Sequence, residues 1–240
     1  MTEAGYSVSV ICPKAYGFER SHETIDGIEI YRHPTWEASG AIGYIVEYGW
    51  ALAAEFVLAL RIYLRTRFRI LQACNPPDTI FLIALFFKLL GVRFVFDQHD
   101  LAPELFEAKF GCKGFLYRLV QLAERLTFKT ADMAIATNDS CRAIALSRGG
   151  VSPDHSSVVR GCPDLDTFRL PAAQHDLKQG RTHLVLYVGI MGPQDGVDLF
   201  LESIAHSVTD RGRRNTLFVL IGSGTELPRL KALAVGSTLG

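Results

Sequence analysis

Residues 184–198 read Leu-Val-Leu-Tyr-Val-Gly-Ile-Met-Gly-Pro-Gln-Asp-Gly-Val-Asp, an apolar run that passes into glycines and then into a helical pattern. The apolar run predicts a buried β-strand, and the residues after Gly196 predict an amphipathic helix. Glycine at a strand end lets the backbone approach a ligand closely, and the first turn of a helix offers unpaired N–H groups to an anion. The stretch therefore predicts an α/β fold that binds a phosphorylated ligand at this turn.

The composition is that of a folded globular protein. The chain has 240 residues, of which 48% are hydrophobic, and its length lies between that of one domain and two. Lysine plus arginine and aspartate plus glutamate each number 25, so no overall positive field favours nucleic acid as a partner. We therefore expect no nucleic-acid ligand.

Cysteine spacing and the lack of a targeting signal indicate a cytoplasmic protein. The five cysteines form no C-x-x-C pair and leave an odd one over, which argues against a zinc site or a disulfide framework. The first six residues show no basic region followed by an apolar one, so no export signal is visible. The apolar stretch 42–60 contains Glu47 and Glu55, which argues against a membrane-spanning helix.

Short apolar runs alternate with longer helical patterns along the whole chain. Several runs are apolar at successive positions, as in parallel strands covered on both faces. The alternation predicts an α/β fold with a doubly wound sheet. The expected strands are residues 7–12, 28–32, 68–73, 92–97, 132–137, 157–160, 184–189 and 217–222. The expected helices are residues 41–65, 78–90, 101–107, 114–130, 140–148, 197–208 and 226–234.

Turn residues and composition suggest two domains. Asn138 offers an N-capping oxygen to the helix that follows it, and Gly149 and Gly150 suit a left-handed helix end. The region before the strand at 184–189 has few apolar residues and no clear period, which is typical of a linker. We expect a Rossmann-like first domain at 1–170, a linker at 171–182 and an incomplete second Rossmann-like domain at 183–240.

Both ends of the chain are expected to be cut. Residues 4–10 read as the end of a helix leading into a second strand rather than a first, and only two strands follow the linker. Two strands bury too little apolar surface for an independent domain. The sequence is therefore expected to be part of a longer protein.

Two glycine-rich turns are candidates for ligand binding. Gly189, Gly192 and Gly196 follow the first strand of the second series, and Gly222 and Gly224 follow the next strand. The spacing is neither G-x-G-x-x-G nor a Walker motif, so each turn alone also suits an ordinary strand-to-helix connection. Because open α/β sheets bind ligands beyond the carboxyl ends of their strands, two such turns together favour a shared ligand crevice.

A group of ionisable residues follows the strand predicted at 92–97, where the chain reads Asp97-Gln98-His99-Asp100. Histidine at the carboxyl end of a parallel strand can bind a substrate hydroxyl or exchange a proton near neutral pH. Two interpretations remain for Asp100. It is either catalytic, or it caps the helix at 101–107, with Glu104 near the first turn.

A basic stretch follows the apolar helix that contains Trp50. It comprises Arg61, Arg65, Arg67 and Arg69, with no acidic residue between the first and the last. Such a stretch can dock on anionic lipid headgroups. The more usual interpretation is a solvated helix end whose cations favour the helix dipole.

Taken together, these segments resemble the family 4 retaining glycosyltransferases, which have two Rossmann-like domains in the GT-B arrangement and use nucleotide-sugar donors. The resemblance extends over nearly all 240 residues. The segments that carry it are 4–10 (Ala-Gly-Tyr-Ser-Val-Ser-Val), 96–104, 136–140 (Ala-Thr-Asn-Asp-Ser), 164–168 (Asp-Leu-Asp-Thr-Phe), 187–198 and 221–227 (Ile-Gly-Ser-Gly-Thr-Glu-Leu).

The resemblance implies that the first domain binds the acceptor and the second the nucleotide-sugar. It implies a retaining reaction in which the leaving diphosphate stabilises an oxocarbenium-like centre, aided by backbone N–H groups and a helix dipole. It implies no metal and no other cofactor. The donor-binding residues that it implies are Gly189, Gly192, Gln194, Gly196, Gly222 and Gly224, and the catalytic residues are His99 and Asp100.

The chain also departs from the family pattern. Many members have an arginine after the first glycine of the 187–198 loop and a lysine before its last, whereas this chain has Ile190 and Asp195. A subgroup with a G-x-M-G-P-Q-D-G-V-D loop looks similar, but the change removes two charge-assisted contacts to a diphosphate. The family's glycine-rich turn after its first strand and its acidic E-x7-E segment are missing from the 240 residues, which argues for a truncated member.

The implied function is transfer of a sugar from a nucleotide-sugar to a glycan or lipid-linked acceptor in cell-envelope polysaccharide synthesis. The protein would act in the cytoplasm, with peripheral contact to the inner face of the membrane. Two alternatives remain open. One is a nucleotide-sugar epimerase of the same architecture, and the other is a catalytically inactive fragment.

Overall fold

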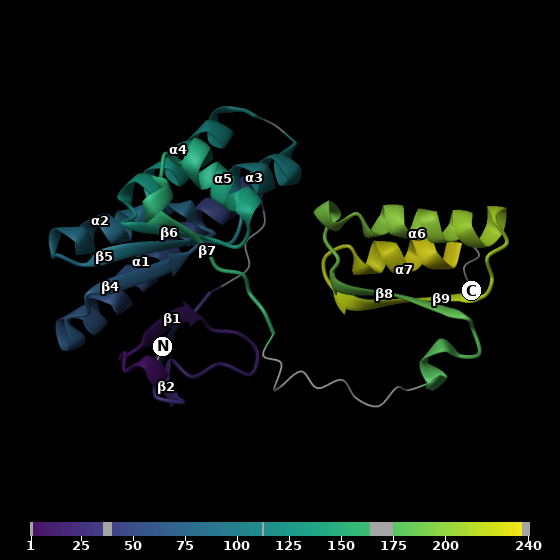
Figure 1. Cartoon of the computed structure of the whole chain (residues 1–240), viewed down its shortest axis with the longest axis horizontal. Coiled ribbons are helices and arrows are strands. Elements are labelled where there is room, and N and C mark those ends of the chain that lie inside the picture. Colours follow the sequence, from purple (N-terminus) through teal and green to yellow (C-terminus); the bar gives the residue numbers. More distant parts are fainter. Residues whose placement is uncertain (1, 36–39, 112, 164–174, 237–240) are drawn as a thin grey trace. The chain divides into compact units, whose positions relative to one another are not determined.

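The computed structural model describes residues 2–35, 40–111, 113–163 and 175–236. The chain divides into two compact units (Figure 1). The first comprises Met1–Glu107 and Gly111–Gly161, and the second comprises Cys162–Gly240 together with Ala108–Phe110. Each unit is described by itself. The linker expected at 171–182 lies partly, and the Asp-Leu-Asp-Thr-Phe segment at 164–168 wholly, outside the described residues.

Strands and helices alternate through both units, which confirms the α/β class. The strands up to residue 161 are β1 (Ser9–Pro13), β2 (His22–Ile25), β3 (Ile28–His33), β4 (Ile70–Cys74), β5 (Arg93–Gln98), β6 (Met133–Ala136) and β7 (Ser156–Val158). The helices of this part are α1 (Gly40–Thr66), α2 (Phe81–Leu89), α3 (Ala102–Phe110), α4 (Phe115–Thr130) and α5 (Asp139–Ser147). The later elements are β8 (His183–Ile190), α6 (Val197–Ala205), β9 (Thr216–Ser223) and α7 (Leu227–Gly236).

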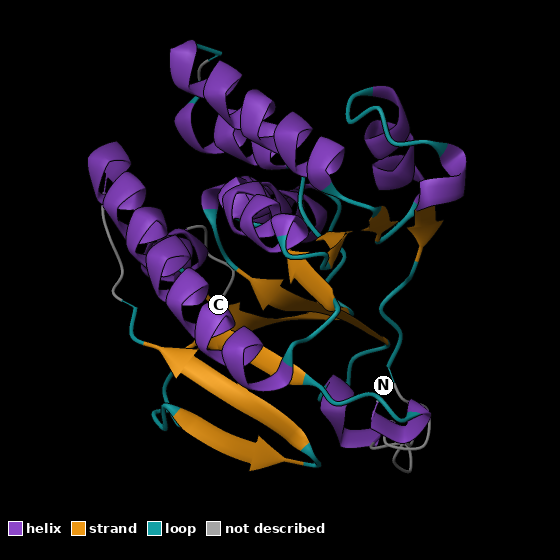
Figure 2. Ribbon diagram, turned by 90° about the vertical axis from the view of Figure 1, so that its left-hand side faces the viewer, coloured by secondary structure: helices purple, strands orange, loops and turns teal. Residues whose placement is uncertain are grey.

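The strands of the first unit form two sheets. Their orders are β1-β3-β2 and β4-β5-β6-β7, and the second sheet is entirely parallel. The single doubly wound sheet that we expected is thus divided, because β1 and β4 each pair along one edge only in the described part of the chain. Figure 2 shows α1 running alongside β3 in the opposite direction, as a crossover helix does.

Strand β2 is an element that the hydrophobic pattern missed. Its sequence, His-Glu-Thr-Ile, is mostly polar and exposed, so it gives no core-facing alternation. It pairs antiparallel with β3 through a two-residue turn in which Asp26 and Gly27 have φ of 51° and 77°. Asp-Gly with both residues at positive φ is the type I′ hairpin turn, and this dipeptide was the available signal.

An aromatic core joins the parallel sheet of the first unit to its helices. Phe87 from α2 and Phe94 and Phe96 from β5 are fully buried. Phe96 meets Phe128 of α4 edge-on, with the ring centroids 5.1 Å apart. Burial of such rings stabilises a core by about 1.5–3 kcal/mol each. The core fixes β5 and therefore the residues that follow its carboxyl end.

The second unit is built on the parallel pair β8 and β9. Helices α6 and α7 cover one face of this pair, where Leu201, Ile204 and Leu230 are buried (Figure 1). On β8 the side chains of Leu186 and Val188 are 53% and 68% exposed. The second unit therefore buries its apolar side chains mainly on the helix-covered side.

Two of the expected helix boundaries are confirmed and one is modified. The Asn138 side chain accepts a hydrogen bond from the backbone N of Cys141 at 2.9 Å, and Gly150 has a φ of 72° after α5 ends. The helix expected at 78–90 begins as a 3-10 turn, Asp78–Ile80, before α2. Among the helices that the structure describes, none combines the length and apolar character needed to cross a bilayer.

Candidate functional site

His99 lies directly beyond the carboxyl end of β5, where the sequence predicts it. Its side chain is 54% exposed, and its Nε2 atom is 3.4 Å from Oδ1 of Asp97. The other Asp97 oxygen accepts a hydrogen bond from Nε2 of Gln72 at 3.0 Å. Alternate residues of a strand share one face, so Asp97 and His99 present a carboxylate and an imidazole side by side.

Asn75 fixes the backbone of the His99 loop. Its Oδ1 atom accepts hydrogen bonds from the backbone N of His99 at 2.9 Å and of Asp100 at 3.2 Å. Its Nδ2 atom donates to the carbonyl oxygen of Asp100 at 2.8 Å and to Oδ1 of Asp78 at 3.0 Å. Asn75 reaches this loop because Cys74, the last residue of β4, pairs with Asp97 of β5.

The interpretation of Asp100 as a helix cap is wrong. Helix α3 begins at Ala102, its N-cap residue is Leu101, and no side chain caps it. The reason is that Asn75 already holds both backbone polar groups of Asp100, which keeps this residue outside the helix. Glu104 does lie in the first turn of α3, where its carboxylate binds Arg148.

Buried charged residues lie behind the loop. The Glu124 side chain is 1% exposed, and its Oε2 is 2.7 Å from Nε of Arg148, whose Nη1 is 2.6 Å from Oε1 of Glu104. Burial raises the pKa of Glu124, whereas the hydrogen bond from Arg148 lowers the pKa of Glu104. Burial, followed by the charge of Glu124, raises the pKa of Asp78 to about 7. Asp78 connects these buried groups to the loop, because its Oδ1 atom accepts a hydrogen bond from Asn75.

Further ionisable groups lie near Asp97. Burial raises the pKa of the Cys74 thiol, and the charges of Asp97 and Glu55 raise it further. Burial also raises the pKa of Glu55, whose Oε1 is 3.8 Å from Nε2 of His33. Carboxylates and an imidazole gathered at the carboxyl ends of parallel strands can bind sugar hydroxyls and move a proton.

In the second unit the two glycine-rich turns lie side by side. Strands β8 and β9 pair in register, so that Gly189 is opposite Gly222. A Cβ atom on Gly222 would overlap the carbonyl oxygen of Gly189, and one on Gly224 would overlap the backbone of Met191. Gly222 and Gly224 are therefore required by the close approach of the two turns, whether or not a ligand also approaches them.

The first glycine turn binds a carboxylate of its own chain. The backbone N of Gly192 donates to Oδ2 of Asp195 at 2.7 Å, and the exposed Gln194 folds back beside Gly192. Gly196 has a φ of 64°, which suits glycine, and α6 begins immediately after it. A donor diphosphate at Gly192 would therefore compete with Asp195 for this N–H group.

A cation lies close to this turn. Arg229 of α7 donates through Nη2 to Oδ2 of Asp198 at 3.0 Å, and through Nε to Glu226. The hydrogen bond from Arg229 lowers the pKa of Asp198. Arg229 therefore links the residues that follow the two glycine turns.

The predicted site residues fall into two groups. His99 and Asp100 lie together in the first unit, and the six donor-binding residues lie together around two adjacent turns of the second. In the described part of the chain no group of three or more His, Cys, Asp or Glu side chains could hold a metal ion. The expectation that the reaction needs no metal stays a prediction.

Sequence reasoning missed Asn75 and Arg229 as members of these groups, and it named Asp97 only as part of the ionisable segment. The position of Asp97 beside His99 follows from the period of two, which places both residues on one face. Asn75 follows a predicted strand and precedes two prolines, which marks a loop at the same sheet edge. No sequence signal connects Arg229 to the glycine turns.

Comparisons with known proteins agree with this fold, and a family model assigns the chain to a class. A model of the family described as glycosyl transferase 4-like domain matches residues 1–161, and the chain belongs to this family. No curated protein sequence is significantly similar to the chain.

Three solved structures share the fold at low sequence identity. Sucrose-phosphate synthase from Thermosynechococcus elongatus has a TM-score of 0.71 and 16% identity, over 100% of this chain and 60% of that one. HepE from Anabaena, in complex with UDP and glucose, has a TM-score of 0.57 and 14% identity, over 89% of this chain and 54% of that one. A mutant of S. aureus TarM, in complex with fondaparinux, α-GlcNAc-glycerol and UDP, has a TM-score of 0.52 and 12% identity, over 70% of this chain and 31% of that one. The chain thus spans between about a third and three fifths of these proteins.

Proposed function

We propose that the protein transfers a glycosyl group from a nucleotide-sugar to a hydroxyl of a glycan or lipid-linked acceptor in cell-envelope polysaccharide synthesis. The reaction takes place in the cytoplasm, at the inner face of the membrane. The observation that carries the proposal is His99, held beside Asp97 at the carboxyl end of β5 in a chain of the glycosyl transferase 4-like family. The retaining mechanism comes from the family resemblance alone.

The residues of the first unit have defined tasks in this proposal. His99 hydrogen-bonds a hydroxyl of the transferred sugar, and Asp97 orients the imidazole through its 3.4 Å contact. Asn75 holds the His99 backbone in place before the substrate arrives. Such prior positioning reduces the reorganisation needed at the transition state.

The residues of the second unit bind the donor diphosphate and nucleoside. Unpaired N–H groups at the start of α6 and its dipole attract the diphosphate. Asp195 opposes this attraction, because its carboxylate occupies the N–H group of Gly192. Donor binding is therefore expected to displace Asp195. UDP is the nucleotide to test first, because two of the similar structures contain it.

Calorimetric titration of the 240-residue chain with UDP, GDP and ADP tests the donor half of the proposal. We expect one nucleotide to bind more tightly than the others, and binding of none would overturn the proposal. Incubation of the matching nucleotide-sugar with and without a glycan acceptor then separates the reactions. Transfer needs the acceptor, whereas an epimerase produces a new sugar isomer from the donor alone.

Replacement of His99 tests its role in the transfer step. His99→Ala is expected to lower transfer by about a hundredfold or more while leaving nucleotide binding unchanged. His155→Ala is the matched control, since His155 is also exposed but lies far along the chain from the loop. Equal activity of the two variants would remove His99 from the mechanism.

A further inference from the structure

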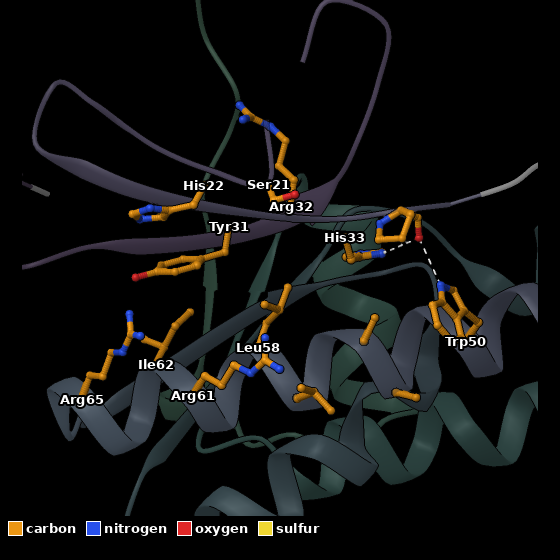
Figure 3. A pocket seen from close by; sticks show the side chains of 14 residues that line it. Ser21, His22, Tyr31, Arg32, His33, Trp50, Leu58, Arg61, Ile62 and Arg65 are labelled. Carbon is orange, nitrogen blue, oxygen red and sulfur yellow. Dashed lines mark hydrogen bonds between the residues drawn. The ribbon is translucent and has the colours of Figure 1, made fainter. Parts of the chain in front are cut away.

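A groove of about 600 Å³ lies in the first unit between the β2–β3 hairpin and α1 (Figure 3). Tyr31 and His22 lie on its hairpin side, with their rings 4.5 Å apart, and Arg61 and Arg65 lie on its helix side. His33 lines the groove, but neither Asn75 nor the residues of the His99 loop do, so the groove does not contain the candidate catalytic residues.

One wall of the groove is an apolar face of α1. Ala53, Ala54 and Val57 follow Trp50 at intervals of three or four residues, so they lie along one side of the helix. The small side chains of the two alanines leave space beside the helix, and Val57 is 45% exposed. Trp50 is held at one end, because its Nε1 atom donates to the carbonyl oxygen of Pro34 at 3.1 Å.

The other end of the groove is positively charged. Arg61 and Arg65 are exposed and lie one helical turn apart. Among the described residues neither arginine forms a hydrogen bond or an ion pair, and no acidic side chain lines the groove. Arg32 of the hairpin differs, because its Nη1 atom is 2.5 Å from Oε1 of Glu23. The charge of Arg61 and Arg65 is thus uncompensated.

The helix dipole does not account for both arginines. Arg65 lies in the last turn of α1, where a cation favours the dipole. Arg61 lies a full turn earlier, where this effect is weak. Two guanidinium groups at this spacing can instead donate charge-assisted hydrogen bonds to one phosphate group.

We infer that the groove binds a phosphorylated lipid. Arg61 and Arg65 hold the phosphate, and the hydrocarbon chain lies along Ala53, Ala54 and Val57. A free phosphate would leave this apolar wall in water, and an uncharged chain would leave both arginines without a partner. The inference deepens the proposed function, which has a lipid-linked acceptor at a membrane, but its test measures lipid binding and can fail or succeed independently of glycosyl transfer.

Vesicle sedimentation of the whole chain tests the inference. The vesicles are phosphatidylcholine alone, phosphatidylcholine with phosphatidylglycerol, and phosphatidylcholine with a polyprenyl phosphate; glycerol phosphate serves as a soluble competitor. We expect binding only where a phosphorylated anionic lipid is present. A preference for one of the two distinguishes a bulk membrane lipid from a lipid carrier. Binding to phosphatidylcholine alone that matches the other two would overturn the inference.

Two variants separate the groove from general surface charge. Arg61→Ala with Arg65→Ala is expected to weaken vesicle binding about thirtyfold, since each basic residue near an anionic surface contributes to attraction. Arg69→Ala with Arg93→Ala removes the same charge from exposed positions that do not line the groove. This control is expected to weaken binding severalfold less. Equal losses would overturn the assignment to the groove.

A third variant tests the apolar wall without changing charge. Ala53 is exposed in the groove, so Ala53→Phe fills the space and leaves both arginines in place. We expect weaker binding to the anionic vesicles and an unchanged thermal unfolding temperature. Unaltered binding by a folded Ala53→Phe protein would show that no lipid chain enters the groove, and would overturn the inference.

Discussion

The side-chain oxygen of Asn75 lies 2.9 Å from the backbone nitrogen of His99, across 24 positions of sequence. The same oxygen also accepts a bond from Asp100, so one amide side chain fixes the turn that carries the candidate imidazole. The position of His99 therefore depends on the end of β4 as much as on β5.

Asn75→Ala is expected to destabilise the first unit by about 1–3 kcal/mol, because it leaves partly buried backbone N–H groups without partners. Hydrogen exchange should show faster exchange at the amides of His99 and Asp100. Asn138→Ala, which removes the N-cap of α5, should cost about 1 kcal/mol without changing exchange at these two amides. Unchanged protection in Asn75→Ala would mean that other contacts hold the loop.

The Asp78 carboxyl should make stability depend on pH. Its pKa is about 7 in the folded protein and about 3.9 in an unfolded chain. Between these values the folded protein binds the proton and the unfolded chain does not, so stability falls as pH rises from about 4 to 7. Asp78→Asn removes this loss, which corresponds to about 1.4 kcal/mol for each unit of pKa difference.

Urea unfolding of the wild type and Asp78→Asn at several pH values measures the effect. The difference between the two proteins should widen up to pH 7 and then stay constant. Asp154→Asn, at an exposed position, should follow the wild type throughout. If the free energies of unfolding of Asp78→Asn and the wild type changed in parallel with pH, Asp78 would be ionised over the whole range.

Arg148 forms ion pairs with one buried and one partly exposed carboxylate. Breaking these two pairs should lower the free energy of unfolding by different amounts. Arg148→Met leaves the buried Glu124 without its partner and should destabilise the protein by about 3–5 kcal/mol. Glu104→Gln breaks only the more exposed pair, whose loss should cost about 0–1 kcal/mol. Equilibrium unfolding in urea compares them, and similar losses would contradict the unequal burial.

Gly222→Ala should disrupt the second unit, because the added methyl group meets the carbonyl oxygen of Gly189. Overpacking of this kind costs about 1–3 kcal/mol. Gly236→Ala is the control in the same unit, since nothing lies within 4 Å of its added carbon. Hydrogen exchange across β8 and β9 should rise in the first variant alone. A neutral Gly222→Ala would mean that the strands can separate at no cost.

Asp195→Ala should strengthen nucleotide binding. The change frees the N–H group of Gly192 and removes a negative charge near the start of α6. Charges at this position are worth about 0.3–1 kcal/mol, so UDP affinity should rise roughly twofold to fivefold. Asp210→Ala removes the same charge near the other end of α6 and should leave affinity unchanged in the same titration. Weaker binding by Asp195→Ala would assign Asp195 to the ligand.

Much of the fold could be predicted because its elements are long and their patterns strong. Helix α1 was expected at 41–65 and occupies Gly40–Thr66, and the expected strand 92–97 is β5, Arg93–Gln98. Apolar periodicity determines such elements locally. The division into two sheets could not be predicted, because the pairing of β1 and β4 depends on distant strands.

The candidate site was less predictable than the fold. Position after a buried strand was enough to single out His99. The contact with Asn75 could not be inferred, because it follows from the register of β4 against β5. From the sequence, Asp195 stood out only because it replaces a lysine found in many family members. The structure shows that its carboxylate accepts a hydrogen bond from the backbone of Gly192.

The open edges of β1 and β4 affect how the protein behaves at high concentration. Each edge leaves backbone N–H and C=O groups without a strand beside them in the described residues, and Val10 and Ile70 on these strands are exposed. Unprotected strand edges are templates for a strand from another molecule. Strand addition at these edges is therefore a route to self-association, and dilution favours the monomer.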